Sequence, residues 1–573
     1  MRITYKPSVT NKFDNKNNKQ LSDFEDELKL HEDNKMKKLN ITGMTCEHCA
    51  ITVEKALNKV DGIQKATVSF TNNRASITTN KDIADKDILD AVKKVGYGAS
   101  VIENQESDKE VHIAIIGSGA AAFAAAIKAS EGGAKVTMIE RGVTGGTCVN
   151  IGCVPSKIMI RSAHIAHLRR NSPFDDGISP CNLEIDREML LEQQQQRVDD
   201  LRHAKYENIL EINPSINLVH GFATFKDAHT LQVKLTGGGT QEITFDKALI
   251  ATGASPFIPD IEGLDKTPFW TSTEALVARK IPQRLVVYGS SSVALELAQA
   301  YQRLGSSVTL IARSRLLSRE DDLIGEELEK ILKEEGMQII KNANFQSVSY
   351  ENHHFHLSIN DKQILSDALL IATGRKANTA KLGLENIGVK TNTNGTIIVN
   401  AHLQTSVEHI YAGGDCTSNQ AFVYVAAAAG TRAAANMLGK NEVLDTSIVP
   451  AVVFTEPQVA TVGLDEKQAK EKGYEVDTRI LDLENVPRAL ANFDTNGFIK
   501  MVAQKDTGLL LGVQALCDNA SDVIQSAALA LRAKMSVQEL ATELFPYLSM
   551  VEGLKLCAQT FNKDVKQLSC CAG

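Results

Sequence analysis

The pattern of apolar and polar positions divides the chain into a short front part and a long main body. Residues 1–36 are rich in Asn, Lys and Asp and carry little apolar pattern, which predicts a mobile arm. Over 37–102 the pattern predicts a strand, helix, strand, strand, helix and strand, in these segments: LNIT, 50–60, KATVSF, RASITT, DKDILDAVKKVG and ASVIE. That order is typical of a ferredoxin-like domain. The polar segment 103–109 indicates a linker.

The main body, from about residue 110, contains one pattern twice. The first copy, IAIIGSGAAAFAAAIKASEGGAKVTMIERG, starts at Ile113, and the second, LVVYGSSSVALELAQAYQRLGSSVTLIARS, starts at Leu285. Each copy is an apolar strand, a Gly turn, an Ala-rich helix and a second apolar strand. The copies are too far apart for a solenoid, so they predict two separate nucleotide-binding βαβ units in an α/β body. After about 449 strands and helices mix again, which predicts a third, α+β unit.

Composition narrows the class of function. The 573 residues carry a net charge of −8, with 43% hydrophobic and 23% charged residues. The acidic balance argues against a nucleic-acid partner, which would call for a basic patch. No apolar run reaches the roughly 18 residues of a membrane helix, and the first residues lack the apolar core of a secretory signal. We therefore expect a cytoplasmic protein without stable membrane insertion, whose thiols are kept reduced.

The first Gly turn has the residues that a dinucleotide needs. Gly117 permits the tight turn, Gly119 lets a pyrophosphate approach the backbone, and the small Ala122 lets helix and strand pack closely. The helix then begins at the anion. Glu140 ends the next strand, where a carboxylate can accept hydrogen bonds from ribose hydroxyls. The segment predicts a dinucleotide site, to which we assign FAD.

The second copy differs from the first at the strand end, the position that distinguishes NADPH from NADH. It has Gly289, Ser291 and Ala294, and Ala312 stands where the first copy has its acid. The missing carboxylate removes repulsion against a 2′-phosphate, and the following Arg313 can bind one, which favours NADPH over NADH. Arg313 could instead be a solvated surface residue, because the first copy has Arg141 at the same place.

Six of the ten cysteines form close pairs. The pairs are Cys46 with Cys49, Cys148 with Cys153, and Cys570 with Cys571. In a reducing compartment such pairs indicate metal binding or redox chemistry rather than a disulfide framework. The scattered Cys181, Cys416, Cys517 and Cys557 are interpreted as small buried hydrophobic residues.

The segment GGTCVNIGCVPSK resembles the redox-active segment of the pyridine nucleotide-disulphide oxidoreductases. The resemblance implies that Cys148 is the outer interchange thiol and Cys153 the thiol next to the flavin, and that Lys157 lies near the flavin N5 and pairs with Glu296. The family segments ATGASP, ATGRKAN and YAGGDC also occur. In YAGGDC, Asp415 matches the acid that binds the FAD ribityl chain. The resemblance runs from about 110 to the C-terminus.

One departure separates this chain from the disulphide reductases of the family. They end with His-Pro-Thr-x-x-Glu, whose His protonates the leaving thiol, whereas FPYLSMVEG has Tyr547 at the His position and Glu552 at the Glu position. A phenol with a pKa near 10 is a poor proton relay at neutral pH. Mercuric reductases show the same departure, and FVYVAAAAGTRAA also resembles their sequence. By that resemblance Tyr424 and Tyr547 flank Hg(II) at the inner cysteine pair, although simple core packing is the alternative for each tyrosine.

The terminal LSCCAG supplies two adjacent thiols on a chain end, which is usually mobile. Soft thiolates bind soft metals, so we expect Cys570 and Cys571 to capture Hg(II) from thiol complexes and pass it to Cys148 and Cys153. The resemblance implies a homodimer in which each tail reaches the other subunit's active site.

At the front, GMTCEHC resembles the metal-binding segment of heavy-metal-associated domains, with Cys46 and Cys49 as two thiolate ligands for one soft cation. His48 is expected to be exposed rather than a ligand. A structural zinc site is disfavoured, because it needs four protein ligands and no second pair of Cys or His residues lies nearby in the sequence.

The sequence thus predicts an enzyme that reduces Hg(II) to Hg(0) with NADPH through FAD and a redox-active cysteine pair. The expected domains are a heavy-metal-associated domain over 37–102, an FAD domain over 110–257 and 378–448, an NADPH domain over 258–377, and a dimerisation domain over 449–573. A dihydrolipoamide- or glutathione-type disulphide reductase is the alternative enzyme, and a metal-binding chaperone the alternative of another class.

Overall fold

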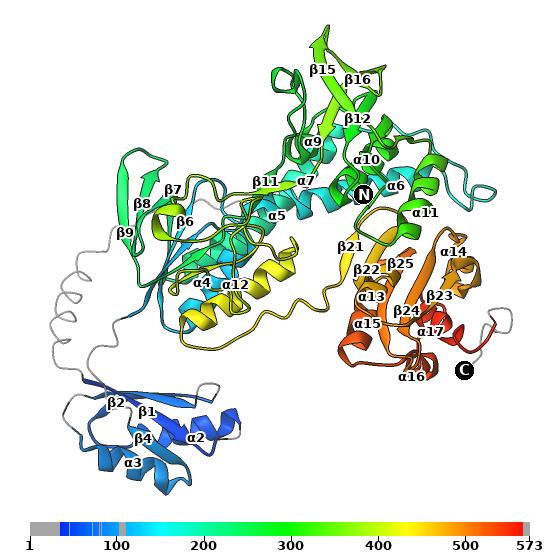
Figure 1. The fold of residues 1–573 in the computed structure, drawn as a ribbon. Helices are drawn as coiled ribbons and strands as arrows, with labels where there is room; N and C mark the ends of the chain where they lie inside the picture. Colours follow the sequence, from blue (N-terminus) through cyan, green and yellow to red (C-terminus); the bar gives the residue numbers. More distant parts are fainter. Residues whose placement is uncertain are drawn as a thin grey trace, which may run out of the picture. The chain divides into compact units, whose positions relative to one another are not determined.

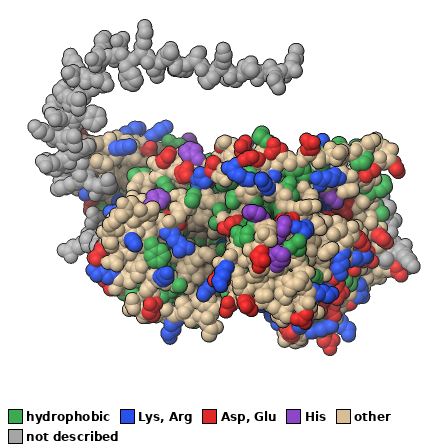
Figure 2. Space-filling view, turned by 90° about the horizontal axis from the view of Figure 1, so that it is seen from above, with side chains coloured by type: hydrophobic (Ala, Val, Ile, Leu, Met, Phe, Trp, Pro, Cys, Tyr) green, Lys and Arg blue, Asp and Glu red, His purple; other side chains and the backbone are tan. Residues whose placement is uncertain are grey.

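The computed structural model describes residues 35–44, 46–70, 73–79, 81, 83–101 and 110–564. The chain separates into two compact units, 1–109 and 110–573. Most of the predicted arm, the predicted linker and the Cys570–Cys571 pair lie outside the described residues. On the face shown in Figure 2, Lys and Arg side chains are mixed with Asp and Glu side chains.

The first unit is a four-stranded antiparallel sheet of order β2-β3-β1-β4 with two helices (Figure 1), the βαββαβ arrangement that the sequence predicted. Its elements are β1 (Lys35–Thr42), α2 (Glu47–Leu57), β2 (Ile63–Ser69), β3 (Arg74–Thr79), α3 (Asp85–Lys94) and β4 (Gly98–Val101). Alternate strand residues such as Leu39, Ile41 and Ile77 are buried, together with Val53 and Val92 from the helices. One apolar face of the sheet is thereby covered by the two helices.

The first helix begins earlier than its apolar pattern indicated. It starts at Glu47 rather than at residue 50, with Cys46 as its N-cap in extended backbone. The residues between the two cysteines are polar, so the periodicity of apolar residues did not indicate that the helix includes them. Cys46 therefore precedes the helix and Cys49 lies in its first turn.

The second unit opens with a seven-stranded sheet of order β20-β10-β5-β6-β7-β8-β9. The first five strands are parallel and the last two add an antiparallel meander. The strands are β5 (His112–Ile116), β6 (Lys135–Glu140), β7 (Ile216–Asp227), β8 (Thr230–Leu235), β9 (Thr240–Thr244), β10 (Lys247–Ile250) and β20 (Ile410–Ala412). The accompanying helices are α4 (Ala120–Glu131), α5 (Gly146–Ile151), α6 (Cys153–Arg170), α7 (Arg187–Arg202), the π-helical turn η1 (His203–Glu207), α8 (Asn208–Ile212), η3 (Glu385–Ile387) and α12 (Val423–Met437).

A second parallel sheet, of order β14-β13-β12-β18, holds the second Gly turn. A three-stranded antiparallel sheet β15-β16-β17 stands beside it, and β11 pairs with β19. The elements are β11 (Ala254–Pro256), η2 (Leu264–Lys266), α9 (Ser272–Val277), β12 (Arg284–Tyr288), α10 (Ser292–Leu304), β13 (Ser307–Ile311), α11 (Asp322–Glu334), β14 (Gln338–Ile340), β15 (Phe345–Glu351), β16 (His354–Ile359), β17 (Lys362–Ser366), β18 (Ala368–Ile371) and β19 (Arg375–Ala377).

The C-terminal part is a five-stranded antiparallel sheet of order β21-β22-β25-β24-β23, with helices packed against it (Figure 1). Its elements are β21 (Ala451–Val453), β22 (Gln458–Gly463), α13 (Glu466–Glu471), β23 (Val476–Asp482), η4 (Leu483–Asn485), α14 (Pro487–Asn492), β24 (Phe498–Gln504), β25 (Leu510–Cys517), α15 (Ala520–Arg532), α16 (Val537–Thr542) and α17 (Glu552–Gln559). The predicted fold class, an α/β body with two nucleotide-binding units and an α+β C-terminal unit, is confirmed.

Three of the four scattered cysteines are buried as expected, Cys416, Cys517 and Cys557. The expectation is wrong for Cys181, which is exposed on the segment between α6 and α7. That segment is rich in Pro, Gly, Asp and Ser, and a cysteine on such a loop has no sheet or helix to cover it.

Candidate active site

The two Gly turns have the same local geometry. Gly117 and Gly289 both have positive φ angles, of 116° and 144°. A Cβ at Gly117 would collide with the carbonyl oxygen of Ala251, and one at Gly289 with that of Ala372. Each turn therefore needs glycine, both for its backbone conformation and for its close contact with the neighbouring strand.

The helices that follow these turns begin without a side-chain cap. Gly119 is the N-cap of α4 and Ser291 that of α10, and neither provides a capping hydrogen bond. Several other helices of the chain, such as α9, α13 and α16, have complete capping boxes. Ala122 and Ala294 are fully buried against their strands. The first N–H groups of α4 and α10 thus remain available to an anion, which is what a pyrophosphate requires.

Glu140 lies at the end of β6, in a pocket that also contains Gly117. Its carboxylate accepts hydrogen bonds from Ser118 Oγ at 2.6 Å and from the backbone N–H of Gly142 at 2.6 Å. These contacts orient the carboxylate while leaving it lone pairs for ribose hydroxyls. In the same pocket the buried Thr252 hydroxyl oxygen has no hydrogen-bond partner within the described residues. Such an orphaned polar atom fits a pocket that takes a polar ligand.

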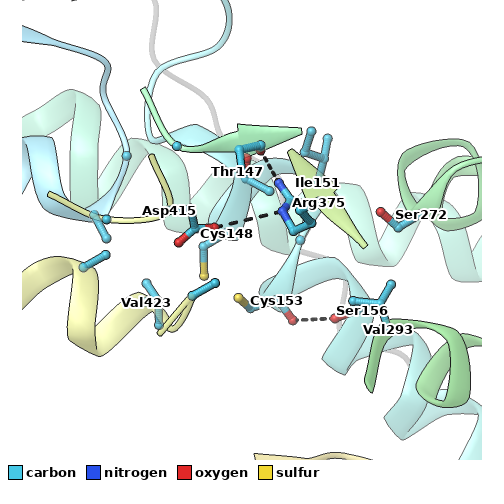
Figure 3. Close-up of a pocket in the computed structure, with 18 of the residues that line it drawn as sticks. Thr147, Cys148, Ile151, Cys153, Ser156, Ser272, Val293, Arg375, Asp415 and Val423 are labelled. Carbon is cyan, nitrogen blue, oxygen red and sulfur yellow. Dashed lines mark hydrogen bonds and ion pairs between the residues drawn. The ribbon is translucent and has the colours of Figure 1, made fainter. Parts of the chain in front are cut away.

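The cysteine pair lies in a second pocket, shown in Figure 3, which the first Gly turn borders through Gly119. Gly119, Cys148, Cys153, Asp415 and Val423 are among the residues that line it. Cys148 is on α5 and Cys153 is the first residue of α6, and Figure 3 shows their sulfur atoms side by side. A Cβ on Gly152, between the two helices, would lie 2.9 Å from the Thr147 carbonyl oxygen. Glycine there allows the chain to turn tightly enough to bring the two thiols together.

The two thiols differ in acidity. A hydrogen bond from the Cys148 thiol, helped by Lys157 and the backbone N–H at the start of α6, lowers the pKa of Cys153 to about 7. The same hydrogen bond, together with burial, raises the pKa of Cys148. The arrangement therefore favours a thiolate on Cys153, stabilised by the helix N-terminus, and a protonated Cys148.

Lys157 is one helical turn after Cys153 and lines the same pocket. Its Nζ lies 2.7 Å from Glu296 Oε2 on α10, and 4.6 Å from the centre of the Phe454 ring. Glu296 is almost fully buried and also accepts a hydrogen bond from the Phe454 backbone N–H at 2.9 Å. The pair therefore connects α6, α10 and the loop between β21 and β22 of the C-terminal sheet, and it fixes a positive charge beside the cysteines.

Asp415 faces the pocket from the segment after β20. Its carboxylate is 4.0 Å from Arg375 Nε, and Arg375 also donates to the Ala254 carbonyl oxygen (Figure 3). Burial raises the pKa of Asp415, while Arg375 lowers it. Arg375 belongs to the segment ATGRKAN, yet sequence reasoning did not single it out, because nothing local indicates that it reaches an acid 40 positions away.

The second nucleotide pocket lies at the second Gly turn. Gly289, Ser291 and Arg313 line it, together with Arg319. Ala312 is fully buried, so no acidic side chain stands at the end of β13. Arg319 was missed in the sequence because it lies beyond the strand end, on a loop whose path the sequence pattern does not fix. Two guanidinium groups in a pocket without that acid suit a phosphate monoester.

A tyrosine that the sequence analysis did not single out, Tyr206, lies close enough to the cysteines to interact with them electrostatically. Burial, followed by the charges of Cys148 and Cys153, raises the pKa of Tyr206, so its hydroxyl stays protonated. It lies in the π-helical turn η1, a feature common at functional sites. Its ring packs edge-to-face on Phe123 with the centroids 4.9 Å apart.

Tyr424 has other contacts. Its hydroxyl donates to the Pro450 carbonyl oxygen and its ring stacks on Phe422, while burial raises its pKa to about 12. Val423, its neighbour on α12, lines the cysteine pocket, and Tyr424 does not. On a helix, adjacent residues point in different directions, and the resemblance alone did not show which of them faces the pocket. Tyr206 does not line the cysteine pocket either, so the predicted role of Tyr424 stays a prediction.

Tyr547 is about half exposed, in the turn before α17, and is not among the residues that line the cysteine pocket of its own chain. Glu552 is buried and accepts a hydrogen bond from the Leu548 backbone N–H at 3.1 Å, which orders this turn. Cys570 and Cys571 lie outside the described residues.

The front unit presents a second pair of thiols. Cys46 and Cys49 sulfur atoms are 3.3 Å apart at the N-terminus of α2, and His48 between them is exposed. Tyr97, from the turn before β4, is hydrogen-bonded to Cys49, and this contact raises its pKa. Sequence reasoning missed Tyr97, which is 48 residues away. Within the described part of the chain, no group of three or more His, Cys, Asp or Glu side chains could hold a metal ion.

Comparison with known proteins identifies the family. The model for the pyridine nucleotide-disulphide oxidoreductases matches residues 111–430, its dimerisation-domain model matches 449–558, and the heavy-metal-associated domain model matches 38–98. The chain belongs to the pyridine nucleotide-disulphide oxidoreductase family. Among the described residues of this family member, no helix is long and apolar enough to cross a membrane.

Several relatives that this chain resembles along most of its length are mercuric reductases. The chain is 54% identical to a mercuric reductase of Shigella flexneri, over 94% of this chain and 100% of that protein. It is 54% identical to a mercuric reductase of Acidithiobacillus ferrooxidans, over 93% and 98%. At this identity and coverage the oxidoreductase falls within the mercuric reductases. A flavoprotein disulphide reductase of Escherichia coli induced by HOCl is a structural neighbour, with a TM-score of 0.71 and 30% identity over 78% of this chain and 99% of that one.

Proposed function

We propose that this chain reduces Hg(II) to Hg(0) with electrons from NADPH, passed through FAD to a site formed by Cys148 and Cys153. The observation that carries the proposal is the cysteine pair itself, with a thiolate favoured on Cys153, in a pocket lined by Gly119, Lys157 and Asp415. The similarity to mercuric reductases across nearly the whole chain supports the substrate. Two sulfur ligands suit a soft cation better than the hard cations that carboxylates bind.

The residues of this chain fit the expected cofactor. The uncapped start of α4 would hold the FAD pyrophosphate, Glu140 the adenosine ribose, and Asp415 the ribityl chain. The uncapped start of α10 would hold the NADPH pyrophosphate, with Arg313 and Arg319 at the 2′-phosphate. When bound, FAD supplies two-electron transfer from NADPH to the cysteine site.

The cysteines exchange ligands with the incoming metal complex. The Cys153 thiolate attacks Hg(II) first, because Lys157 and the start of α6 favour its ionised form. Its attack displaces one thiolate ligand of the incoming complex. The second thiolate ligand then leaves with the proton of Cys148, and Cys148 becomes the second sulfur ligand. Two electrons reduce Hg(II), both S–Hg bonds break, and each sulfur keeps its electron pair. The overall reaction converts NADPH and Hg(II) into NADP⁺, Hg(0) and one proton.

Lys157 and Glu296 have a supporting role in this scheme. The buried Glu296 carboxylate holds the ammonium in the pocket of the cysteines, so a positive charge stays near the thiolate. Tyr206 adds a protonated hydroxyl near the pair, and we propose that it assists ligand exchange. Tyr547 and the Cys570–Cys571 tail, which the sequence assigned to the metal, would act from the second subunit. The family's dimerisation domain supports a homodimer.

We retain the domain division predicted from the sequence as part of this proposal, with the FAD domain over 110–257 and 378–448, the NADPH domain over 258–377 and the dimerisation domain from 449. The front domain over 37–102 would bind Hg(II) at Cys46 and Cys49. A cytoplasmic location belongs to the same proposal, because Hg(II) arrives there as thiol complexes and NADPH is made there.

Stopped-flow oxidation of NADPH tests the function directly. With HgCl₂ and excess thiol the purified protein should oxidise NADPH and release Hg(0), measured as volatile mercury. Lipoamide and glutathione disulphide serve as competing substrates. Faster oxidation with either disulphide than with Hg(II) would overturn the proposal in favour of a disulphide reductase. Binding of Hg(II) without any NADPH oxidation would leave only a metal-binding role.

A further inference from the structure

The second nucleotide pocket is not built by its own sheet alone. Its wall includes Val459 and Thr461, which belong to β22 of the C-terminal sheet. The opposite wall is the loop 313–320, between β13 and α11, which carries Arg313 and Arg319. Both arginines are on exposed positions of this loop. Where their guanidinium groups point therefore depends on how the loop backbone is held.

One arginine of the loop, Arg315, holds the loop together internally. It donates to the carbonyl oxygens of Leu317 at 3.3 Å, Ser318 at 3.1 Å and Glu320 at 2.7 Å. The backbone N–H of Leu317 donates to the Ser290 carbonyl oxygen at 2.9 Å, which attaches the loop to the second Gly turn. Glu320 follows Arg319, and Arg315 also pairs with Asp322 Oδ1 at 2.7 Å, so these contacts hold the loop on both sides of Arg319 within the nucleotide unit.

The C-terminal sheet adds a second set of contacts at the end after Arg319. Thr461 Oγ1 donates to Glu320 Oε2 at 3.0 Å. Lys500, on β24, places its Nζ 2.7 Å from Asp321 Oδ2, and the side chains of this ion pair are only 9% and 7% exposed. Glu466 lies 3.6 Å from the same ammonium. Asp321 uses its other oxygen to cap α11 through the Leu323 N–H at 3.1 Å, so the ion pair fixes both the loop end and the helix start.

We propose that Lys500 is a positioning residue for the coenzyme's 2′-phosphate: through Asp321 it sets the backbone of the loop that carries Arg313 and Arg319. The inference rests on the proposed use of NADPH. A buried ion pair of this kind contributes little net stability, but removing one partner leaves the other charge buried and uncompensated. Without Lys500, Asp321 moves toward solvent, and the contacts of Glu320 and Asp322 with Arg315 and Thr461 hold the loop end less firmly than the two sets of contacts together. The C-terminal sheet then contributes to coenzyme selection as well as to dimer formation.

The test isolates the 2′-phosphate from the rest of the coenzyme. Adenosine 2′,5′-bisphosphate and AMP are titrated separately into the oxidised holoenzyme by calorimetry, and the ratio of their affinities is compared among variants. Lys500→Met should weaken the bisphosphate roughly tenfold, the amount expected when a charge-assisted contact is misplaced, and change AMP binding less than about twofold. Lys500→Arg should restore most of the ratio. Lys505→Met is the matched control, since Lys505 directly follows β24, the strand that carries Lys500, but its pair with Glu475 is exposed.

A second variant separates an effect on phosphate binding from a folding defect. Asp321→Asn keeps an oxygen that can cap α11 but loses the ion pair, and it should lower the affinity ratio in the same direction. Thermal unfolding and FAD content are measured for each protein. Reduced stability with an unchanged ratio in both variants would show a merely structural ion pair and overturn the inference. Equal binding of both probes by the unmodified enzyme would instead overturn the proposed NADPH preference. A failure of Hg(II) reduction alone would leave the affinity ratio, and this inference, intact.

Discussion

At the scale of single residues, the site works through one acidic thiol. Cys153 has a lowered pKa of about 7 because it accepts a hydrogen bond from Cys148 and lies near Lys157 at a helix start. Cys148 has the opposite shift. A thiolate is the form that binds metals and attacks their thiol complexes, so this asymmetry provides a nucleophile and a proton in the same pocket.

The lowered pKa predicts a pH dependence of thiol reactivity. The Cys153 thiolate is present above about pH 7 and is lost as the pH falls through that value. Alkylation of the reduced enzyme by iodoacetamide, followed by mass spectrometry of the peptide, should therefore show a midpoint near pH 7 at Cys153. Lys157→Met should move the midpoint upward, because it removes a charge that stabilises the thiolate. A midpoint above pH 8.5, as for an ordinary thiol, would contradict the assignment.

The two tyrosines offer a matched pair of substitutions. Tyr206→Phe keeps the ring on Phe123 and removes the hydroxyl near the cysteines. We expect Hg(II) reduction to slow roughly tenfold, or about 1.4 kcal/mol in barrier, while NADPH reduces the bound FAD at an unchanged rate. Tyr424→Phe removes only a hydrogen bond to Pro450 and should have a smaller effect. The reverse order in single-turnover kinetics would restore the role that the sequence gave to Tyr424.

At the scale of elements, pairs of helices hold the chemistry in place. The α6 and α10 helices carry Lys157 and Glu296, whose ion pair joins them. The α4 and α12 helices approach each other even more closely, because Gly430 of α12 lies against the backbone of Ala121. The start of α4 is the FAD pyrophosphate site in our proposal, so the packing of α12 decides how precisely that site is formed.

Gly430→Ala tests this contact. Alanine is the better helix former by about 1 kcal/mol, but its Cβ would collide with the Ala121 carbonyl oxygen. The Ala121 backbone cannot move aside as a flexible side chain can, so we expect a net loss of about 1–3 kcal/mol in the free energy of unfolding. We also expect the variant to retain FAD less tightly. Thr431→Ala, at the exposed neighbouring position, is the control. Chemical denaturation and FAD release measure both effects, and a more stable Gly430→Ala variant would show that helix propensity outweighs the collision.

At the scale of the whole molecule, the chain combines two separately folded units with a tail of two thiols. The first unit has its own core, centred on residues such as Leu39, Val53 and Ile77. The second unit contains both Gly turns and the inner cysteines. In our proposal, Hg(II) capture at Cys46 and Cys49 and Hg(II) reduction at Cys148 and Cys153 therefore take place in different units.

Removal of residues 1–109 should leave Hg(II)-dependent NADPH oxidation largely intact, because every residue proposed for FAD and NADPH belongs to the second unit. The steady-state kcat and the FAD content of the truncated and full-length proteins are compared at saturating Hg(II). Loss of FAD on truncation would make the first unit part of the catalytic core.

Replacing Cys570 and Cys571 by Ala should impair turnover most when Hg(II) arrives on strong, bulky thiol ligands such as glutathione. Small ligands such as bromide should be tolerated better, since they can reach Cys148 and Cys153 directly. Mixing this variant with an inner-pair variant should restore some activity if the tail acts across the dimer. Equal rates for variant and unmodified enzyme at every thiol concentration would refute the relay, whereas inactive mixed dimers would refute only its crossing between subunits.

What the sequence determined by itself is the local chemistry. Gly117, Gly289 and Cys153 owe their roles to neighbours within a few positions, so a turn followed by a helix start could be predicted from contiguous residues. The loss of an acid at Ala312 and the paired thiols of Cys46 and Cys49 were visible in the same way. The pairing of Lys157 with Glu296 came from a family resemblance, because spacing alone does not join residues on separate helices.

Only the tertiary structure decided which distant side chains complete each site. Tyr206 interacts electrostatically with the cysteines from a π-helical turn, and Tyr97 contacts Cys49 from the turn before β4. Lys500 meets Asp321 across two sheets, 179 positions apart. Such contacts depend on how the elements pack, and packing is set by the summed burial of many side chains rather than by any local pattern. The direction in which a helix residue such as Tyr424 points was fixed in the same way.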